Sequence, residues 1–472
     1  MKIKHITLLG LAPLAILTSP FEVQAQTNFF NFGADHQLSN EDIQKIQDVY
    51  NAIQSNYIEE ADKDTLLRGA LEGMVNALGD PYSEYLDASE SQMFDETIEG
   101  SFFGIGVQIM SQNGKVVIIS PITDTPAEKA GLQPNDIILE ADGTVLTDMD
   151  TNQVVSYIRG EAGTKVKLTI QRGSNVFEVE VERAEIPITS VTGELDENSK
   201  EIGFVQINQF SGTTSQELVE VVEDLRGQGA KAFIFDLRNN PGGLLDQAIT
   251  ISNMFLEDGQ VVMQVQEKDV DPTVYEANDA AYGDFQITES YVVLINEGSA
   301  SASEILSAAI QENTQSPLLG QTSFGKGTVQ NITNESELGE LKLTIAKWLT
   351  PNGTWIHDTG ITPTIEVAPD PLTSSVLLNE SETLQVGDAN EFVKTAISIL
   401  KALGYQVESD YLYDESVKLA VEAFQADKEL TVDGIITGDT ATQLNLAARD
   451  YLKENDPQYD KAVEVVKGLL QS

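Results

Sequence analysis

The feature that most limits the fold of this chain is the alternation of strand and helix patterns between residues 186 and 370. Two apolar runs, IGFVQI and AKAFIFDLR, are candidates for buried strands, and the amphipathic pattern TTSQELVEVVEDLRGQG lies between them. A third run, YVVLIN, leads directly into the helix-like segment SASASEILSAAIQ. Such alternation indicates an α/β layer structure.

The flanking segments have different patterns, so the predicted fold class is α/β with several domains. Residues 98–185 contain short β-type runs separated by Gly, Asn and Asp, which predicts a small β-rich domain. Residues 26–97 are expected to form a linker and then two or three amphipathic helices that end at Gly79. A linker is expected over 371–387, followed by a small helical bundle over 388–472.

The first 25 residues have the pattern of a signal peptide. Lys2 and Lys4 precede an apolar stretch over 6–17, and a small-residue cleavage signal ends at Ala25. A bilayer span needs about 20 apolar residues, so this stretch is too short to span comfortably. We expect export and cleavage near Ala25, with an uncleaved N-terminal membrane anchor as the alternative.

The charged and nucleophilic residues exclude several classes of function. The chain has 75 Asp and Glu against 28 Lys and Arg, and its net charge of -47 argues against a nucleic-acid partner. It has no Cys, which removes disulfides, Cys nucleophiles and thiolate metal sites. Of three His, only His357 lies in a predicted domain, so we expect neither a Ser-His-Asp triad nor a metal site, and no cofactor.

Two segments could carry catalytic chemistry. Serines occur at alternate positions from Ser299 to Ser303, where a helix begins, and such a Ser ordinarily caps the helix. The second segment places Lys326 among glycines; a lysine there is usually solvated, but in a water-poor cleft its amine can act as a base. A phosphate-binding P-loop is not expected, because Thr328 comes one residue late and a strand pattern follows.

Together these segments resemble the carboxyl-terminal processing peptidases, also called tail-specific proteases, which use a Ser-Lys mechanism. The family's S-A-S-A-S-E-I and F-G-K-G-T-V-Q runs are both present, and the resemblance extends to motifs across residues 40–370. The family spacing of 25 residues between nucleophile and lysine implies Ser301 as the nucleophile and Lys326 as the general base. The resemblance also implies that Gln330, four residues after the lysine, orients its amine.

Two backbone N–H groups are expected to hold the oxyanion of the reaction. One is that of Ala302 at the helix start, where the helix dipole favours negative charge. The resemblance implies that the other belongs to Gly242 or Gly243 in the turn after Pro241. His357 is the rival for the general base, and we interpret it instead as a partly buried structural histidine.

The β-rich domain resembles a PDZ domain, which the resemblance implies captures the C-terminus of a protein as an added β-strand. Its carboxylate loop and the strand after it are assigned to Phe103, Gly104, Ile105, Gly106 and Val107. The alternative is that the glycines of this run only form an ordinary tight turn. Arg159, at the end of the domain's helix, is the candidate that links peptide binding to the active site, with a simple surface arginine as the alternative.

The C-terminal segment resembles a peptidoglycan-binding domain of the three-helix type, with a purely structural helical domain as the alternative. The sequence therefore predicts a secreted, wall-associated serine endopeptidase that acts on proteins with free C-termini. A catalytically idle scaffold that joins a PDZ domain to the wall is the competing hypothesis. The sequence determines neither the substrate nor the oligomeric state, so a homo-oligomer remains open.

Overall fold

The computed structural model describes residues 38–112, 114–149, 151–278, 285–333 and 339–471. The signal peptide predicted over 1–25 lies outside these residues. The chain divides into two compact units, Met1–Met74 and Val75–Ser472, and each is considered by itself. In the described ranges, no helix has both the length and the apolar character needed to span a membrane.

The described part of the first unit consists of helices with an open apolar face. Helix α1 (Asn40–Asn56) begins where the Ser39 hydroxyl accepts the Asp42 N–H, and α2 (Lys63–Asn76) follows after a short turn. Apolar side chains of both helices, including Ile46 and Leu67, line a hollow of about 660 Å³. These are the amphipathic helices that the spacing predicts.

The second unit starts with the last residues of α2, strand β1 (Glu84–Leu86) and helix α3 (Ala88–Glu99). A six-strand antiparallel sheet then follows, in which β3-β4-β5-β7-β8 are neighbours in this order and β6 (Thr144–Val145) pairs with β5. The elements of this β-rich domain are β3 (Val107–Gln112), β4 (Lys115–Pro121), α4 (Pro126–Lys129), β5 (Ile137–Ala141), α5 (Thr151–Ile158), β7 (Lys165–Arg172) and β8 (Asn175–Glu182).

Alternation along β7 explains how this small domain forms its core. Val166, Leu168 and Ile170 are fully buried, whereas the residues between them face away from the core. A separate two-strand ladder, β2 (Ser101–Gly104) with β9 (Ala184–Pro187), connects both ends of the domain to the rest of the unit.

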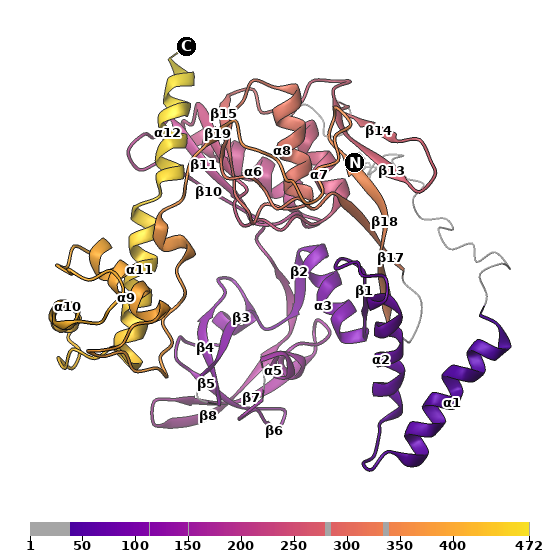
Figure 1. The fold of residues 1–472 in the computed structure, drawn as a ribbon, viewed down its shortest axis with the longest axis horizontal. Coiled ribbons are helices and arrows are strands. Elements are labelled where there is room, and N and C mark those ends of the chain that lie inside the picture. The colour runs from indigo at the N-terminus through magenta and orange to yellow at the C-terminus, as the bar shows by residue number, and fades with distance from the viewer. Residues whose placement is uncertain (1–37, 113, 150, 279–284, 334–338, 472) are drawn as a thin grey trace, which may run out of the picture. The chain divides into compact units, whose positions relative to one another are not determined.

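The larger α/β domain is built on a six-strand sheet in the order β10-β11-β12-β15-β16-β19 (Figure 1). Only the β10–β11 pair is antiparallel, and the other neighbours run parallel, as strand–helix alternation predicts. The strands are β10 (Val191–Leu195), β11 (Ile202–Ile207), β12 (Ala232–Asp236), β15 (Ser290–Ile295), β16 (Leu318–Gly320) and β19 (Ile365–Glu366).

Helices cover both faces of this sheet. One face, which includes Phe233 and Phe235, packs against α6 (Thr214–Gln228), α7 (Leu245–Asn253) and α8 (Ala302–Asn313). The other face, which includes Ile234 and Leu294, packs against α12 (Pro457–Leu470). Because successive side chains of a strand point to opposite faces, a fully apolar strand such as β12 requires cover on both sides.

A second sheet supplies one wall of the site described below. Its order is β1-β18-β13-β14, and β17 also pairs with β18. Strand β17 begins directly after the lysine loop, and the antiparallel pairing of β17 with β18 fixes where that loop ends. The bounds are β13 (Val261–Glu267), β14 (Thr273–Glu276), β17 (Thr328–Thr333) and β18 (Glu340–Leu349).

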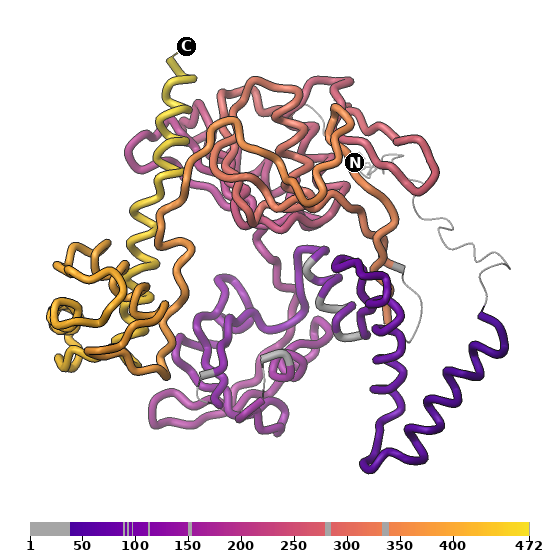
Figure 2. The backbone as a smooth tube through the Cα atoms, viewed as in Figure 1, coloured from indigo at the N-terminus to yellow at the C-terminus, as the bar shows by residue number. Residues whose placement is uncertain are grey.

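The C-terminal helices have two different packing partners. Helices α9 (Glu391–Ala402), α10 (Glu415–Asp427) and α11 (Gly438–Glu454) share a core with the short helix η3 (Pro371–Ser374). Helix α12 instead lies along β12, β15 and β16, and Figure 2 traces this last segment beside the strands. The range 388–472 therefore combines a helical module with a helix that completes the α/β layers.

Candidate active site

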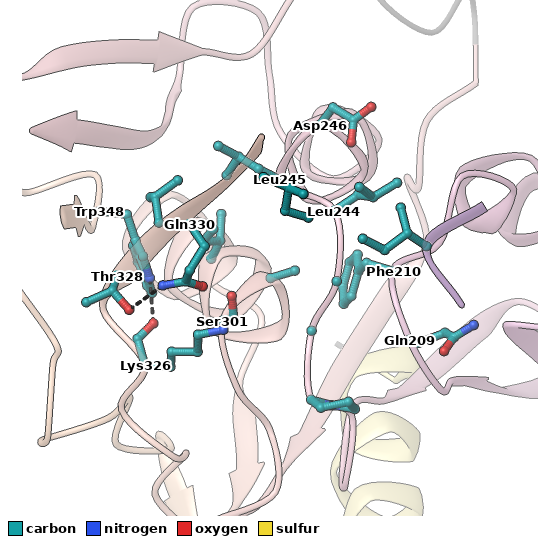
Figure 3. A pocket seen from close by; sticks show the side chains of 18 of the residues that line it. Gln209, Phe210, Leu244, Leu245, Asp246, Ser301, Lys326, Thr328, Gln330 and Trp348 are labelled. Carbon is teal, nitrogen blue, oxygen red and sulfur yellow. Dashed lines mark hydrogen bonds between the residues drawn. The ribbon is translucent and has the colours of Figure 1, made fainter. Parts of the chain in front are cut away.

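The carboxyl ends of the parallel strands border a pocket of about 600 Å³ (Figure 3). The turn after β12, the start of α8, the strands β17 and β18, and helix α3 all contribute to its wall. Its lining residues include Phe94, Ile98, Phe210, Gly242, Gly243, Leu245, Ser301, Ala302, Lys326, Gln330, Lys342 and Trp348. The pocket therefore combines mainly apolar walls with a few polar groups, as ligand sites commonly do.

Ser301 is held in a backbone conformation that side chains rarely adopt. It is the residue that precedes α8, and its φ of 56° and ψ of −112° lie outside the regions that are comfortable for a residue with a Cβ. The turn places its side chain in the pocket wall. Strain of this kind is often found at functional sites, because the surrounding structure must maintain it.

Lys326 reaches the same pocket from the loop before β17. In Figure 3 the nitrogen of Lys326 lies beside the hydroxyl of Ser301, and both side chains line the one cavity. The two residues predicted as nucleophile and base are thus brought together, although they belong to separate segments. Trp348 fixes the base of the lysine loop, because its indole N–H donates to the Lys326 carbonyl at 2.7 Å.

The surroundings of Lys326 favour its neutral amine. Burial lowers the pKa of Lys326 below its ordinary value of 10.5, and the positive charge of Lys342 acts in the same direction. Negative charges oppose this shift without cancelling it, and they come from Asp80, Glu304 and Glu84. A neutral lysine amine can accept a proton, so the site can supply general-base chemistry without a histidine.

Tyr82 covers the lysine amine on one side. The Lys326 nitrogen lies 5.1 Å from the centroid of the Tyr82 ring, and this ring also meets His357 edge-on at 6.0 Å. Burial raises the pKa of Tyr82, with Asp358 and Asp80 adding to the effect, so the ring remains an uncharged phenol. Tyr82 was not among the residues predicted from the sequence, and it lies in the segment 69–87, GALEGMVNALGDPYSEYLD.

Glu304 joins the two catalytic segments and was also missed. Its side chain is 0% exposed, and its two oxygens accept hydrogen bonds from the serine turn and from the lysine loop. The donors are the N–H of Ser301 at 2.8 Å, the hydroxyl of Ser323 at 2.6 Å, the N–H of Gly325 at 2.6 Å and the N–H of Lys326 at 2.8 Å. The Ser-x-x-Glu spacing was the available signal, since it marks a carboxylate that returns to the start of its own helix.

Gln330 lines the pocket, but its amide nitrogen does not contact the lysine amine. Its Nε2 donates to the hydroxyls of Thr328 at 2.9 Å and Thr344 at 3.2 Å. In Figure 3 the carbonyl oxygen of Gln330 is on the side of Ser301 and Lys326. The predicted orienting role would therefore involve this oxygen as acceptor.

Backbone N–H groups lie close to Ser301, the predicted nucleophile. A Cβ added at Gly242 would lie 2.9 Å from the Ala302 nitrogen and 2.7 Å from the Ala300 carbonyl oxygen, so the two loops touch at this glycine. The Gly242 N–H already donates to the Asn240 side chain at 2.9 Å. Gly243, with φ of 146°, follows it in the pocket wall. Of the candidate oxyanion donors, Ala302 and Gly242 therefore lie beside Ser301, and the Gly242 N–H is bonded to Asn240 in this conformation.

His357 is held by structural contacts outside the described pocket lining. Its ring stacks on Trp355 with centroids 5.0 Å apart, and its Nδ1 accepts the Gly327 N–H at 3.3 Å. The Asp358 carboxylate lies 3.9 Å from Nε2. These contacts support the interpretation of His357 as a structural residue that shapes the lysine loop from behind.

The residues predicted for peptide capture lie at the junction of β2 and β3. Ile105 is buried, and its carbonyl accepts the Ala127 N–H at the start of α4. Gly106 has φ of 79°, and a Cβ there would come within 2.4 Å of the Thr125 side chain, so only glycine fits. Phe103 and Gly104 pair with β9, and Val107 begins β3.

Arg159 connects the β-rich domain to the active-site region. Its guanidinium pairs with the buried Glu96 carboxylate of α3 and lies 4.7 Å from the centroid of the Phe102 ring. The same helix α3 carries Phe94 and Ile98 into the pocket wall. Arg159 therefore touches an element of the active site directly.

Within the described ranges, no group of three or more His, Asp or Glu residues is arranged to hold a metal ion.

Four family models match successive parts of the chain. Peptidase family S41 matches residues 201–367, which contain both Ser301 and Lys326. A PDZ domain matches 117–172, and a putative peptidoglycan binding domain matches 389–444. The N-terminal domain of the activating protease CtpB matches 17–90, partly outside the described residues.

Relatives match over almost the whole length. The carboxy-terminal processing protease CtpA of Bacillus subtilis (strain 168) is 42% identical over 424 residues, which is 90% of each chain. A probable CtpA-like serine protease of Staphylococcus haemolyticus (strain JCSC1435) is 34% identical over 98% of this chain and 92% of the relative. One from Staphylococcus aureus (strain MSSA476) is 35% identical over 90% and 85%.

Proposed function

This chain belongs to peptidase family S41 as a carboxy-terminal processing serine protease with a PDZ domain, and we propose that Ser301 and Lys326 are its catalytic pair. The observation that carries the proposal is that both side chains meet in one pocket, where burial lowers the pKa of the lysine. The reaction is hydrolysis of a peptide bond within a protein.

The proposed chemistry has two halves. In the first, the Lys326 amine accepts the proton of the Ser301 hydroxyl while Oγ bonds to the carbonyl carbon of the substrate. The lysine then gives this proton to the leaving amine as the C–N bond breaks, which leaves an ester on Ser301. In the second half, water loses a proton to Lys326 and its oxygen bonds to the ester carbon. The bond from this carbon to Ser301 Oγ then breaks, Oγ takes the proton back from Lys326, and the product leaves with a new carboxyl end.

The charge that develops on the substrate oxygen requires donors aimed at it. Ala302 is suited to this role, because its N–H lies in the first turn of α8, where the helix dipole stabilises negative charge. Gly243 is the better second candidate in the present conformation, since the Gly242 N–H bonds to Asn240. Gly242 could serve only after that bond opens.

The competing function is a scaffold without catalysis, and one measurement separates the two. The full-length protein should cleave an unstructured protein such as casein, and Ser301→Ala should abolish cleavage. Ser398→Ala, a serine of α9 that bonds only within its helix, is the matched control and should retain full activity. No cleavage by the wild-type protein would favour the scaffold, whereas equal cleavage by the wild-type protein and Ser301→Ala would refute Ser301 as the nucleophile.

We propose that the PDZ domain delivers substrates by binding their C-termini. The backbone of the loop from Phe103 to Gly106 is suited to a carboxylate, because successive N–H groups in such turns form an anion-binding concavity. Peptides with free C-termini should bind and stimulate hydrolysis, and the same peptides with amidated ends should do neither. Equal stimulation by both forms would refute C-terminal capture.

We propose further that the protein is exported and acts at the cell wall on exported or wall-associated proteins. The leader pattern over 1–25 and the peptidoglycan-binding match support this location. With a net charge of -47, the chain would be repelled by an anionic wall polymer, so binding must depend on local contacts. Full-length Ser301→Ala should sediment with purified peptidoglycan, and N-terminal sequencing of secreted protein should start after residue 25.

A further inference from the structure

Glu304 is a carboxylate buried without a cation as its direct hydrogen-bond partner. Its side chain is 0% exposed, and each of its two carboxylate oxygens accepts two hydrogen bonds. Oε1 accepts from Ser323 and Gly325, and Oε2 accepts from Ser301 and Lys326. Burial of a carboxylate is costly, and the four hydrogen bonds that its oxygens accept offset this cost here.

The arrangement exceeds what a helix cap requires. A cap of α8 needs only the bond between the Glu304 carboxylate and the Ser301 N–H. The other three donors belong to residues 323–326, the loop that carries the lysine base. One carboxylate thus sets the distance between the strained turn at Ser301 and the loop at Lys326.

On this basis, and resting on the proposed function, we infer that Glu304 is a positioning residue that holds nucleophile and base in register. Ser301 follows β15 of one sheet and Lys326 precedes β17 of another. The Phe324 N–H also donates to the Ser299 carbonyl at 3.0 Å, so the two segments touch at a second point. Among the described residues, however, only the Glu304 bonds reach Ser301 and Lys326 themselves. A misplacement of about 1 Å between reacting groups can lower the rate by about 100-fold.

The charge of Glu304 offers a second, independent readout. The groups that act on the lysine amine are Lys342, Asp80, Glu304, Glu84 and the adjacent Tyr82 ring. Among them, the Glu304 carboxylate raises the pKa of Lys326 and so opposes the effect of burial. A neutral side chain at position 304 should therefore move the acidic limb of the pH–rate profile to lower pH, which a purely structural role would not do.

The test compares Glu304→Gln and Glu304→Asp in the full-length protein. Glu304→Gln keeps the shape of the side chain, but its amide NH2 group faces groups that are themselves hydrogen-bond donors. We therefore expect kcat to fall by about 100-fold, while KM stays within about threefold of the wild-type value. Its residual activity should show the acidic limb displaced to lower pH. Glu304→Asp keeps the charge but shortens the reach, so kcat should also fall while the acidic limb stays in place.

Folding and function are controlled separately. The thermal unfolding transition of each full-length variant measures whether it is folded without using the active site, and Glu304→Asp decides the question if Glu304→Gln does not fold. Glu312→Gln makes the same chemical change on α8 away from the pocket and should behave as wild type. The inference is wrong if the folded variants keep kcat within about threefold of wild type. If the wild-type protein itself lacks Ser301-dependent cleavage, the proposed function fails instead.

Discussion

The backbone N–H groups of Ser301 and Lys326 donate to the same atom, Oε2 of Glu304, each at 2.8 Å. The two residues expected to exchange a proton are thereby tied together through their main chains as well as through the pocket they share. This arrangement leaves both side chains available for chemistry, because neither needs to use its functional group to hold the other segment.

Lys342 should tune the pH dependence of hydrolysis. The active form of Lys326 is the neutral amine, so activity is lost as pH falls through the pKa of this residue. The Lys342 charge helps to lower that pKa, and Lys342→Gln should raise it and move the acidic limb to higher pH. Lys347→Gln, on the same strand but over the Trp355 ring, is the control. An unmoved limb in Lys342→Gln would contradict the assignment of Lys326 as base.

Gly242 should tolerate no side chain. A Cβ at this position would meet the Ala300 carbonyl oxygen and the Ala302 nitrogen below 3.0 Å, and its φ of 100° is unfavourable for other residues. Gly242→Ala should therefore push the turn away from Ser301 and lower kcat by at least about tenfold. Gly227→Ala in α6 has open space around it and should retain activity. Unchanged kcat in Gly242→Ala would mean that the turn has no part in the reaction.

His357 should be dispensable for chemistry. Its Nδ1 accepts the Gly327 N–H and its ring stacks on Trp355, so its polar atoms serve the loop. His357→Asn should keep kcat within about threefold of wild type. Its thermal stability should fall, since the stacking contact is lost. A loss of activity as complete as that expected for Ser301→Ala would make His357 the base after all.

Arg159 and Glu96 should be energetically coupled. The Glu96 carboxylate is buried and pairs with the Arg159 guanidinium across two domains of the second unit. In a double-mutant cycle of Arg159→Ala and Glu96→Gln, unfolding should reveal a coupling energy of about 1 kcal/mol, and stimulation by C-terminal peptides should decrease. Arg449→Ala removes the exposed ion pair with Asp450 and should change neither the free energy of unfolding nor the stimulation by peptides. Strictly additive effects would refute the coupling.

Helix α12 should be required for the stability of the protease layers. Val466 is fully buried against a sheet face that contains Ile234 and Leu294. Val466→Ala should lower the free energy of unfolding by about 2 kcal/mol, through lost burial and the cavity left behind. Val432→Ala, at a side chain that is 54% exposed, should leave the free energy of unfolding unchanged. Equal melting temperatures for the two variants would show that α12 only rests on the sheet.

Much of the fold could be predicted because it depends on local patterns. The period of apolar residues distinguishes the strands β11 and β12 from the helix α6 between them, and it reports which positions are buried. The pattern could not assign α12 to the sheet, since an apolar helix face looks the same whichever surface it covers. The last helix therefore could not be separated from the helical module before it.

The candidate site divides in the same way. The family resemblance, through its spacing of 25 residues, selected Ser301 among three alternating serines and paired it with Lys326, and this assignment remains a prediction. Only the tertiary structure decided that Glu304 binds both segments, that Gln330 donates to Thr328, and that Arg159 pairs with Glu96. A sequence pattern indicates whether a side chain must be buried or needs a bonding partner. Which partner it meets depends on how distant segments pack, because hydrogen bonds and ion pairs form between neighbours in space.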